Sequence, residues 1–115
     1  MSEAVQFKSD DLLEKGDGLR FPIPVLGPHA TGFVVRFEGK PYAYVNRCAH
    51  VPVELDWEHG KFFNMTQDWL ICATHGAMYS PQSGRCVMGP CQGKGLSPIP
   101  VSEKDGVVLV HLDQF

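Results

Sequence analysis

The sequence lacks any run of lysine or arginine. Its 115 residues include 10 Lys and Arg against 13 Asp and Glu, which gives a formal net charge of −3 at pH 7. Nucleic acids and anionic lipid surfaces are bound through clusters of basic residues, so neither is expected as a partner. No stretch approaches the roughly 18 apolar residues of a membrane-spanning helix, so a membrane location is not expected either.

The amino terminus lacks the apolar segment of an export signal and has no twin arginine. We therefore expect a cytoplasmic protein. In that reducing compartment, the four cysteines are expected to be metal ligands or free thiols rather than structural disulfides.

The sequence also lacks a helical repeat of apolar residues that continues for three turns. One turn at residues 9–15, with Ser9 as cap and Gly16 as end, is the only helical candidate. Short strand patterns dominate instead, at residues 19–26, 31–38, 41–46, 68–73, 77–80, 85–88, 99–103 and 107–112. Prolines at 22 and 24 restrict the first to an edge or irregular strand, while Gly39-Lys40 and Asp105-Gly106 predict hairpin turns. The length and pattern predict one all-β domain over residues 1–115, built from antiparallel sheets packed as a sandwich or small barrel.

Two short segments each combine a cysteine with a histidine. Cys48 and His50 follow one predicted strand, and Cys72 and His75 follow another, with Gly76 immediately after. A structural zinc site would more often take its cysteines from one half and its histidines from the other. A cysteine nucleophile with a histidine base would use only one pair. Alternation of Cys and His in both halves favours a [2Fe–2S] cluster with two Cys on one iron and two His on the other.

The pattern C-x-H followed by C-x-x-H and glycine resembles the Rieske [2Fe–2S] domain. GAMYSPQSGRC resembles the strand–turn–strand after the second ligand loop of that family. Gly89-Pro90-Cys91 with Leu96 resembles the proline loop that covers the cluster, and VSEKDGVVLVHL resembles the closing hairpin. The resemblance extends in order over most of residues 33–112. It implies a base of antiparallel sheets plus a small, rubredoxin-like cluster-binding lobe at about residues 47–92.

The resemblance implies one bound [2Fe–2S] cluster. Cys48 and Cys72 would bind the buried iron through sulfur, and His50 and His75 would bind the outer iron. Two neutral imidazoles in place of two thiolates make reduction easier, so such centres have potentials of about −150 to +300 mV, against about −400 mV for plant-type ferredoxins.

Residues beside the ligands are expected to tune that potential. In high-potential respiratory members, the second loop resembles C-P-C-H-G-S-x-Y, where the Ser and Tyr hydroxyls donate to sulfur. Tyr79 keeps one donor and Ala77 replaces the other, so an intermediate potential is expected. Gly76 and Pro90 are the other tuning candidates.

The remaining cysteines and the segment between the ligand pairs depart from the respiratory type. Val53 and Ala73 stand where that type has a bridging disulfide. We expect Cys86 and Cys91 to be buried thiols, with a disulfide across Gly89-Pro90 as the alternative. The long segment 51–71 is expected to form a hairpin near Gly60. In this segment, Trp57, Phe62 and Phe63 are expected to pack on the cluster-binding lobe. Glu54, Asp56 and Glu58 are expected to form a solvated face or, alternatively, a docking edge. His29, His59 and His111 are expected to be surface residues.

These features predict an electron-transfer protein and not an enzyme. A mononuclear iron site of two His and a carboxylate, which ring-hydroxylating oxygenases add, is not visible in the sequence. The main expectation is a ferredoxin, monomeric or weakly oligomeric, that passes electrons from a flavin reductase to a terminal oxygenase or reductase. The alternatives are a fixed electron-transfer subunit, similar to the small subunit of nitrite reductase, and a zinc-bound structural module.

Overall fold

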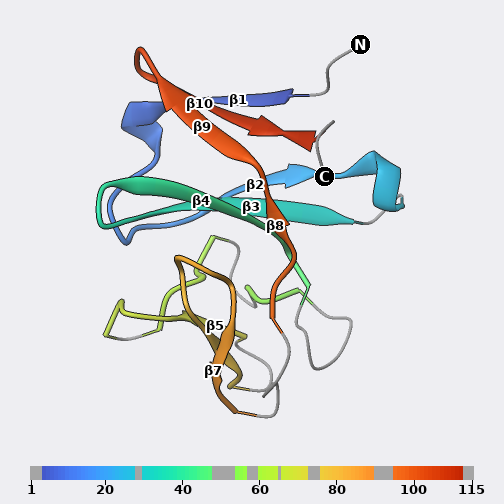
Figure 1. Cartoon of the computed structure of the whole chain (residues 1–115), viewed down its shortest axis with the longest axis vertical. Helices are drawn as coiled ribbons and strands as arrows, with labels where there is room; N and C mark the ends of the chain where they lie inside the picture. The colour runs from blue at the N-terminus through green and yellow to red at the C-terminus, as the bar shows by residue number, and fades with distance from the viewer. Residues whose placement is uncertain are drawn as a thin grey trace.

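Three antiparallel sheets follow one another along the long axis of the molecule (Figure 1). The structure is a computed structural model that describes residues 4–27, 30–47, 54–56, 60–64, 66–72, 76–89 and 95–112. The first sheet has the order β1 (Ala4–Lys8), β10 (Val107–His111), β9 (Val101–Lys104). The second has the order β2 (Leu19–Pro22), β3 (Thr31–Phe37), β4 (Lys40–Val45), β8 (Pro98–Ile99). The third has the order β5 (Leu70–Ile71), β6 (Met78–Tyr79), β7 (Cys86–Met88).

The two predicted hairpins are present, and their turns have the expected left-handed backbone. Asp105 and Gly106 have φ of 54° and 78°, and they join β9 to β10. The turn between β3 and β4 uses Glu38 and Gly39, with φ of 51° and 80°, so it lies one residue earlier than predicted. Two consecutive positive φ values are those of a type I′ turn, whose twist matches the flanking strands.

Proline and the amino-terminal segment decide how the sheets end. β2, which contains Pro22, is an edge strand as predicted. The predicted helical turn at residues 9–15 is instead the short 3₁₀ helix η1 (Ser9–Asp11), and Ser9 makes no capping side-chain bond. A second 3₁₀ helix, η2 (Pro24–Leu26), follows β2. β1 was not predicted; it pairs with β10 from Ala4–His111 to Lys8–Val107.

β3 lies at the centre of the molecule with both faces buried. Val34 packs in the hydrophobic cluster between the first two sheets, whereas Phe33 and Val35 pack in the cluster on the opposite face. The second cluster joins the middle sheet to the third, and its buried members also include Tyr44, Leu55, Phe62, Leu70, Cys72, Ala77, Tyr79 and Leu96. The alternation along a strand therefore gives each face of β3 its own core.

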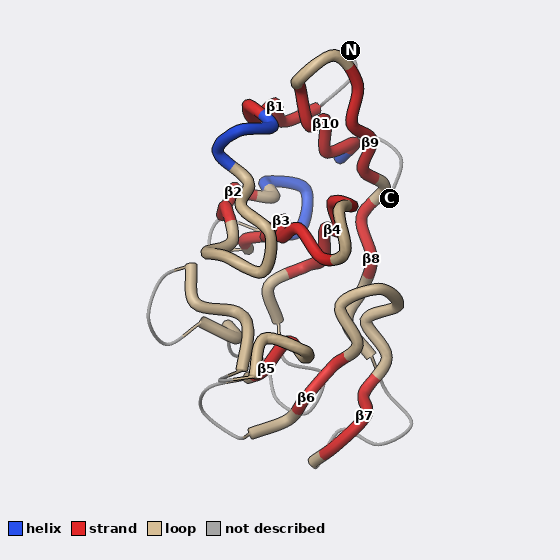
Figure 2. The backbone as a smooth tube through the Cα atoms, turned by 90° about the vertical axis from the view of Figure 1, so that its left-hand side faces the viewer, coloured by secondary structure: helices blue, strands red, loops and turns tan. Residues whose placement is uncertain are grey.

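The third sheet and the segments around it form a lobe at the end of the molecule away from the amino terminus (Figure 2). Tyr44, on β4, reaches into this lobe, and its buried hydroxyl donates to the Pro81 carbonyl at 2.7 Å. Burial raises the pKa of Tyr44 well above its ordinary value. None of the helices in the described ranges is long and apolar enough to cross a membrane.

The long segment between the ligand pairs differs from the expected hairpin. Gly60 has φ of 89°, but the chain reverses later: the Asn64 amide donates to the Trp69 carbonyl at 2.9 Å, and Phe63 forms a bridge with Leu70. Phe62 is fully buried, as expected, and it stacks on Phe33 with ring centroids 3.9 Å apart.

Several predicted positions fall outside the description or differ from it. His111, on β10, is half-buried, and its Nε2 lies 2.8 Å from the Ser102 hydroxyl. Four other residues with predicted positions lie outside the described residues: His29, Trp57, Glu58 and His59.

Candidate metal centre

The second ligand segment begins at the end of β5 with a fully buried cysteine. Cys72 is 0% exposed. Its amide donates to the Ala77 carbonyl, and its carbonyl accepts from the Gly76 amide, both at 2.8 Å. The segment 72–77 is therefore closed at its base by two backbone hydrogen bonds, and it runs from a buried cysteine to an exposed glycine.

Of the four predicted ligands, the structure describes Cys72. The other three, Cys48, His50 and His75, lie outside the described residues, as does Pro90. Within the described ranges, no group of three or more His, Cys, Asp or Glu side chains is gathered as a metal site would require. The ligand set therefore remains the one that the sequence predicts.

Glycines shape the backbone on both sides of the second ligand segment. Gly76 has φ of 73°, a left-handed backbone conformation that favours glycine, although an added Cβ would meet nothing within 4 Å. Gly89 has φ of 96°, and a Cβ there would lie 2.9 Å from Ala77 Cα. The end of β7 thus packs directly against the second ligand segment, a contact that the sequence did not reveal.

Tyr79 and Ala77 both lie inside the lobe. Tyr79 is fully buried on β6, where it pairs with Leu70 of β5 and, past an irregularity, with Cys86 of β7. Ala77 is also 0% exposed. Cys72 belongs to the same buried cluster as both residues. The tyrosine is therefore in the core next to the strand that leads into the ligand segment, while its role as a donor to sulfur stays a prediction.

Cys86 is disulfide-bonded and half-buried, so the expectation of a buried free thiol is wrong for this residue. Two of the other three cysteines, Cys48 and Cys91, lie outside the described residues. A reducing compartment lowers the frequency of disulfides without excluding them.

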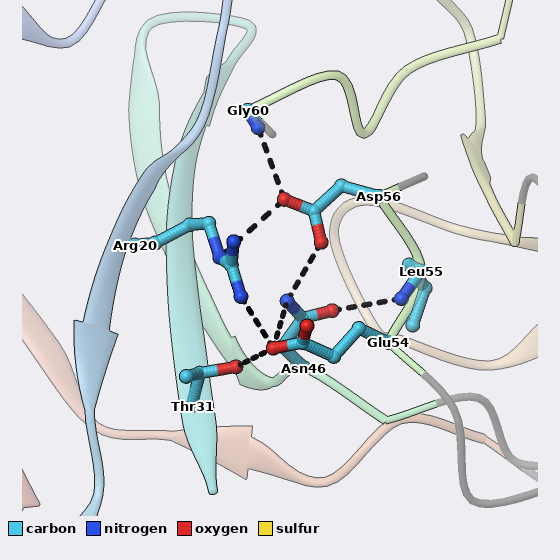
Figure 3. A network of polar contacts seen from close by, with 7 residues as sticks. All are labelled: Arg20, Thr31, Asn46, Glu54, Leu55, Asp56 and Gly60. Carbon is cyan, nitrogen blue, oxygen red and sulfur yellow. Dashed lines mark hydrogen bonds and ion pairs between the residues drawn. The ribbon is translucent and has the colours of Figure 1, made fainter. Parts of the chain in front are cut away.

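A network of polar side chains lies at the end of β4, two residues before the predicted ligand Cys48 in the sequence (Figure 3). Asn46 follows β4, and its Nδ2 donates to Asp56 Oδ1 at 2.9 Å while its Oδ1 accepts the Leu55 amide at 2.9 Å. Asp56 Oδ2 accepts the Gly60 amide at 3.0 Å and lies 3.5 Å from Nε of Arg20. Both Asn46 and Asp56 are 4% exposed.

Glu54 completes this network at its outer edge. Its Oε2 pairs with Arg20 of β2 and accepts a hydrogen bond from the Thr31 hydroxyl of β3. The expected solvated face or docking edge is therefore wrong for Asp56, whose carboxylate is buried, and Glu54 is an ion-pair partner with a partly exposed side chain. In the sequence, the only sign of this network was the acidic residues at every second position.

The donor set fits a Rieske cluster. Two thiolates and two imidazoles are the ligands that such a cluster takes. The described thiol, Cys72, is withdrawn from water at the end of a strand, as a ligand to the inner iron would be. Backbone bonds close its segment, so the cysteine is held in place by the fold.

The comparisons with known proteins agree with this arrangement. The family model of the Rieske [2Fe-2S] domain matches residues 5–110. The ferredoxin of carbazole 1,9a-dioxygenase from Nocardioides aromaticivorans IC177 is similar in structure, with a TM-score of 0.73 and 22% identity over 94% of this chain and 96% of that chain.

Longer chains contain the same fold. The terminal oxygenase of carbazole 1,9a-dioxygenase from the same organism matches with a TM-score of 0.72 and 26% identity over 90% of this chain, but 28% of its own length. A chain in a fluorene-bound oxygenase and ferredoxin complex of carbazole 1,9a-dioxygenase matches with a TM-score of 0.75 and 24% identity over 95% of this chain and 28% of that chain. No curated protein matches the sequence. With its family model matched from residue 5 to residue 110, the chain belongs to the Rieske [2Fe–2S] domain family, whose domains bind one [2Fe–2S] cluster.

Proposed function

We propose that this protein is a one-electron carrier that passes electrons from a flavin-containing reductase to a terminal oxygenase or reductase. A bound [2Fe–2S] cluster supplies a site that accepts and releases a single electron. The protein itself performs no bond chemistry in this role; its residues bind the cluster, shield one side of it and set its potential. The ferredoxin of carbazole 1,9a-dioxygenase, a structural relative of nearly equal length, supports this assignment.

The observation that carries the proposal is the burial of Cys72 in a segment that leads outward to an exposed Gly76. In the proposed ligand set, Cys48 and Cys72 bind the inner iron, and His50 and His75 bind the outer iron. A segment with its cysteine inside and its glycine outside suits this division. It keeps the sulfur in the apolar core while the chain next to the imidazole approaches the surface, where a redox partner docks.

We also assign the chain to one domain over residues 1–115, with the cluster-binding lobe at about residues 47–92, and place the protein in the cytoplasm. Because the net charge of this chain is −3, we expect its partner enzymes to dock without needing a basic surface on it.

The test is the spectrum of the purified protein before and after dithionite. We expect two iron and two sulfide per chain, visible absorption that bleaches on reduction, and an EPR signal in the reduced state. Replacing Cys72 with serine is expected to abolish all three. A colourless protein with one zinc per chain would reject the proposal in favour of the structural zinc module.

Electron transfer is tested separately with a carbazole 1,9a-dioxygenase type of system. We expect the reduced protein to reoxidise on mixing with an oxidised terminal oxygenase, and the oxidised protein to be reduced by a flavin reductase with NADH or NADPH. A protein that contains the cluster but co-purifies in fixed stoichiometry with a larger reductase would favour the subunit alternative.

A further inference from the structure

The network around Asn46 and Asp56 is more deeply buried than its composition would suggest. The Asp56 side chain is fully buried, and the Arg20 side chain that faces it is 20% exposed. A buried carboxylate is costly unless it is paired and hydrogen-bonded. Here both oxygens of Asp56 accept hydrogen bonds, one from the Asn46 side chain and one from the Gly60 amide. An arrangement of this kind holds backbone segments in fixed positions.

The segments that it holds are the two ends of the first ligand segment, residues 47–53. Asn46 stands immediately before that segment, and Leu55 and Asp56 stand just after it. The Asn46 side chain bonds to both of the latter at 2.9 Å, so it joins one end directly to the other. The Asn46 amide also donates to the Thr31 carbonyl at 2.8 Å, which fixes this junction to β3.

Glu54 attaches the far end of the segment to the middle sheet as well. Its carboxylate pairs with Arg20 on β2 and with the Thr31 hydroxyl on β3, as Figure 3 shows. Arg20 lies between Glu54 and Asp56, and its single positive charge is shared by two carboxylates. Both ends of the ligand segment are therefore tied to each other and to two strands of the sheet.

We propose that Asn46 and Asp56, supported by Arg20 and Glu54, are positioning residues: they fix Asn46 and residues 54–56 relative to each other, and the predicted ligands Cys48 and His50 lie between these two points in the sequence. The inference rests on the proposed ligand set, because it assigns the network its role through Cys48 and His50. Ordering a segment before its ligands bind removes the entropy cost of ordering it during binding. Loss of the network is expected to leave a protein that folds but releases its cluster faster.

The main experiment measures cluster release from the loaded protein in excess iron chelator at a temperature well below unfolding. Visible absorbance reports the remaining cluster. We expect Asn46→Ala and Asp56→Asn to lose the cluster at least about 10-fold faster than the wild type, the factor that corresponds to losing one buried hydrogen bond. The EPR spectrum of the reduced, loaded Asn46→Ala protein is expected to broaden, because its ligands sample more geometries.

A matched control comes from the opposite end of β3. The Glu14 carboxylate accepts the amides of Glu38 and Gly39, both at 2.7 Å, and so it also holds a chain reversal through a side chain. Glu14→Gln is expected to lower the unfolding midpoint while it leaves the rate of cluster release within about two-fold of the wild type. A general loss of stability would accelerate release in the control as well, and that result would overturn the positioning role.

Two further variants keep the test decisive. Thr31→Val removes one hydroxyl donor at the edge of the network and preserves side-chain volume, so it serves if Asn46→Ala does not fold; we expect release about 3-fold faster, a part of the main effect. Wild-type release rates in folded Asn46→Ala or Thr31→Val would overturn the inference.

The variant Cys48→Ser separates the positioning role from the proposed function. If that variant retains the cluster as the wild type does, the ligand set is wrong and the inference fails with it. If it loses the cluster while the network variants keep theirs, only the positioning role is wrong.

Discussion

Tyr79 is the residue that the sequence predicts to donate a hydrogen bond to a sulfur of the iron–sulfur cluster. Its side chain is fully buried on β6, in the same hydrophobic core as Cys72. A hydroxyl that donates to sulfur stabilises the reduced, more negative cluster and raises the potential. For Tyr79→Phe we expect a potential lower by about 20–60 mV, which is the value of one hydrogen bond for a one-electron couple. Protein-film voltammetry measures the shift.

A control for this prediction is Tyr42→Phe. Tyr42 lies on β4 of the middle sheet, where it is partly buried and packs against the same hydrophobic core. We expect its potential to match that of the wild type. An unchanged potential in Tyr79→Phe would assign Tyr79 a packing role alone.

Cys86 provides a second prediction at the level of single residues. It is disulfide-bonded. Cys48 and Cys72 are both required as ligands in the proposed set, so we expect the partner of Cys86 to be Cys91. Peptide mapping without reductant, after alkylation of free thiols, should find a peptide that links 86 to 91 and alkylated Cys48 and Cys72. A peptide that links 86 to 48 would contradict the ligand set.

The residues predicted from sequence were those with a local signal. Cys72 and Gly76 stand in one short motif, and their spacing alone indicated a ligand segment. Asn46 and Asp56 could not be found in this way, because the network depends on Arg20, which is 34 positions away from its partner Glu54. Side chains that come together only through sheet pairing leave no pattern in a single sequence.

At the level of elements, the end of β7 supports the second ligand segment through a glycine. Gly89→Ala would place a Cβ 2.9 Å from Ala77 Cα, in addition to the strain of φ at 96°. We expect this variant to lose about 1–3 kcal/mol of unfolding free energy and to hold its cluster less firmly. Chemical unfolding and iron content measure the two effects.

Gly106→Ala separates the contact from the strain. Gly106 has φ of 78°, similar to Gly89, but nothing lies within 4 Å of an added Cβ. It is therefore expected to lose only about 1 kcal/mol and to keep its full iron content. Equal iron content in the two variants would show that the β7 contact does not support the ligand segment.

The elements themselves were predictable to different degrees for a physical reason. Turns such as Asp105-Gly106 have a backbone requirement that few residues meet, so the sequence marks them clearly. β1 has no such mark at its start, and its place depends on pairing with β10, about a hundred residues later. The hairpin expected near Gly60 in the segment 51–71 was also misplaced, because in the described part of this segment the chain reverses between Asn64 and Trp69.

At the level of the whole molecule, one ion pair joins the first two sheets. Arg36 on β3 donates to both carboxylate oxygens of Glu103 on β9, at 2.9 and 2.5 Å, and also to the Leu12 carbonyl at 2.8 Å. The hydrogen bonds from Arg36 lower the pKa of Glu103 from 4.5 to about 2. The Arg36 pKa is raised, chiefly by the same hydrogen bonds.

This pair predicts a pH dependence of stability in acid. The folded-state pKa of Glu103 lies below its unfolded value, so as the pH falls the unfolded chain takes up the proton first. The contribution of the pair is therefore complete above pH 4.5 and declines as the pH falls toward 2. Since the side chain of Glu103 is partly exposed, solvent screening reduces this contribution to about 1 kcal/mol.

Chemical unfolding of the wild type and of Glu103→Gln, in the same metal state at pH 7, 5 and 3.5, measures this dependence. We expect the two proteins to differ by about 1 kcal/mol at pH 7 and 5 and by less at pH 3.5, because the wild type alone loses the ionised pair. Asp17→Asn is the control: its pair with Lys61 has side chains 60% and 54% exposed, so almost no effect is expected at any of these pH values. A gap between the wild type and Glu103→Gln that stays constant from pH 7 to 3.5 would show that the two sheets are held together by their shared apolar cluster and not by this charge pair.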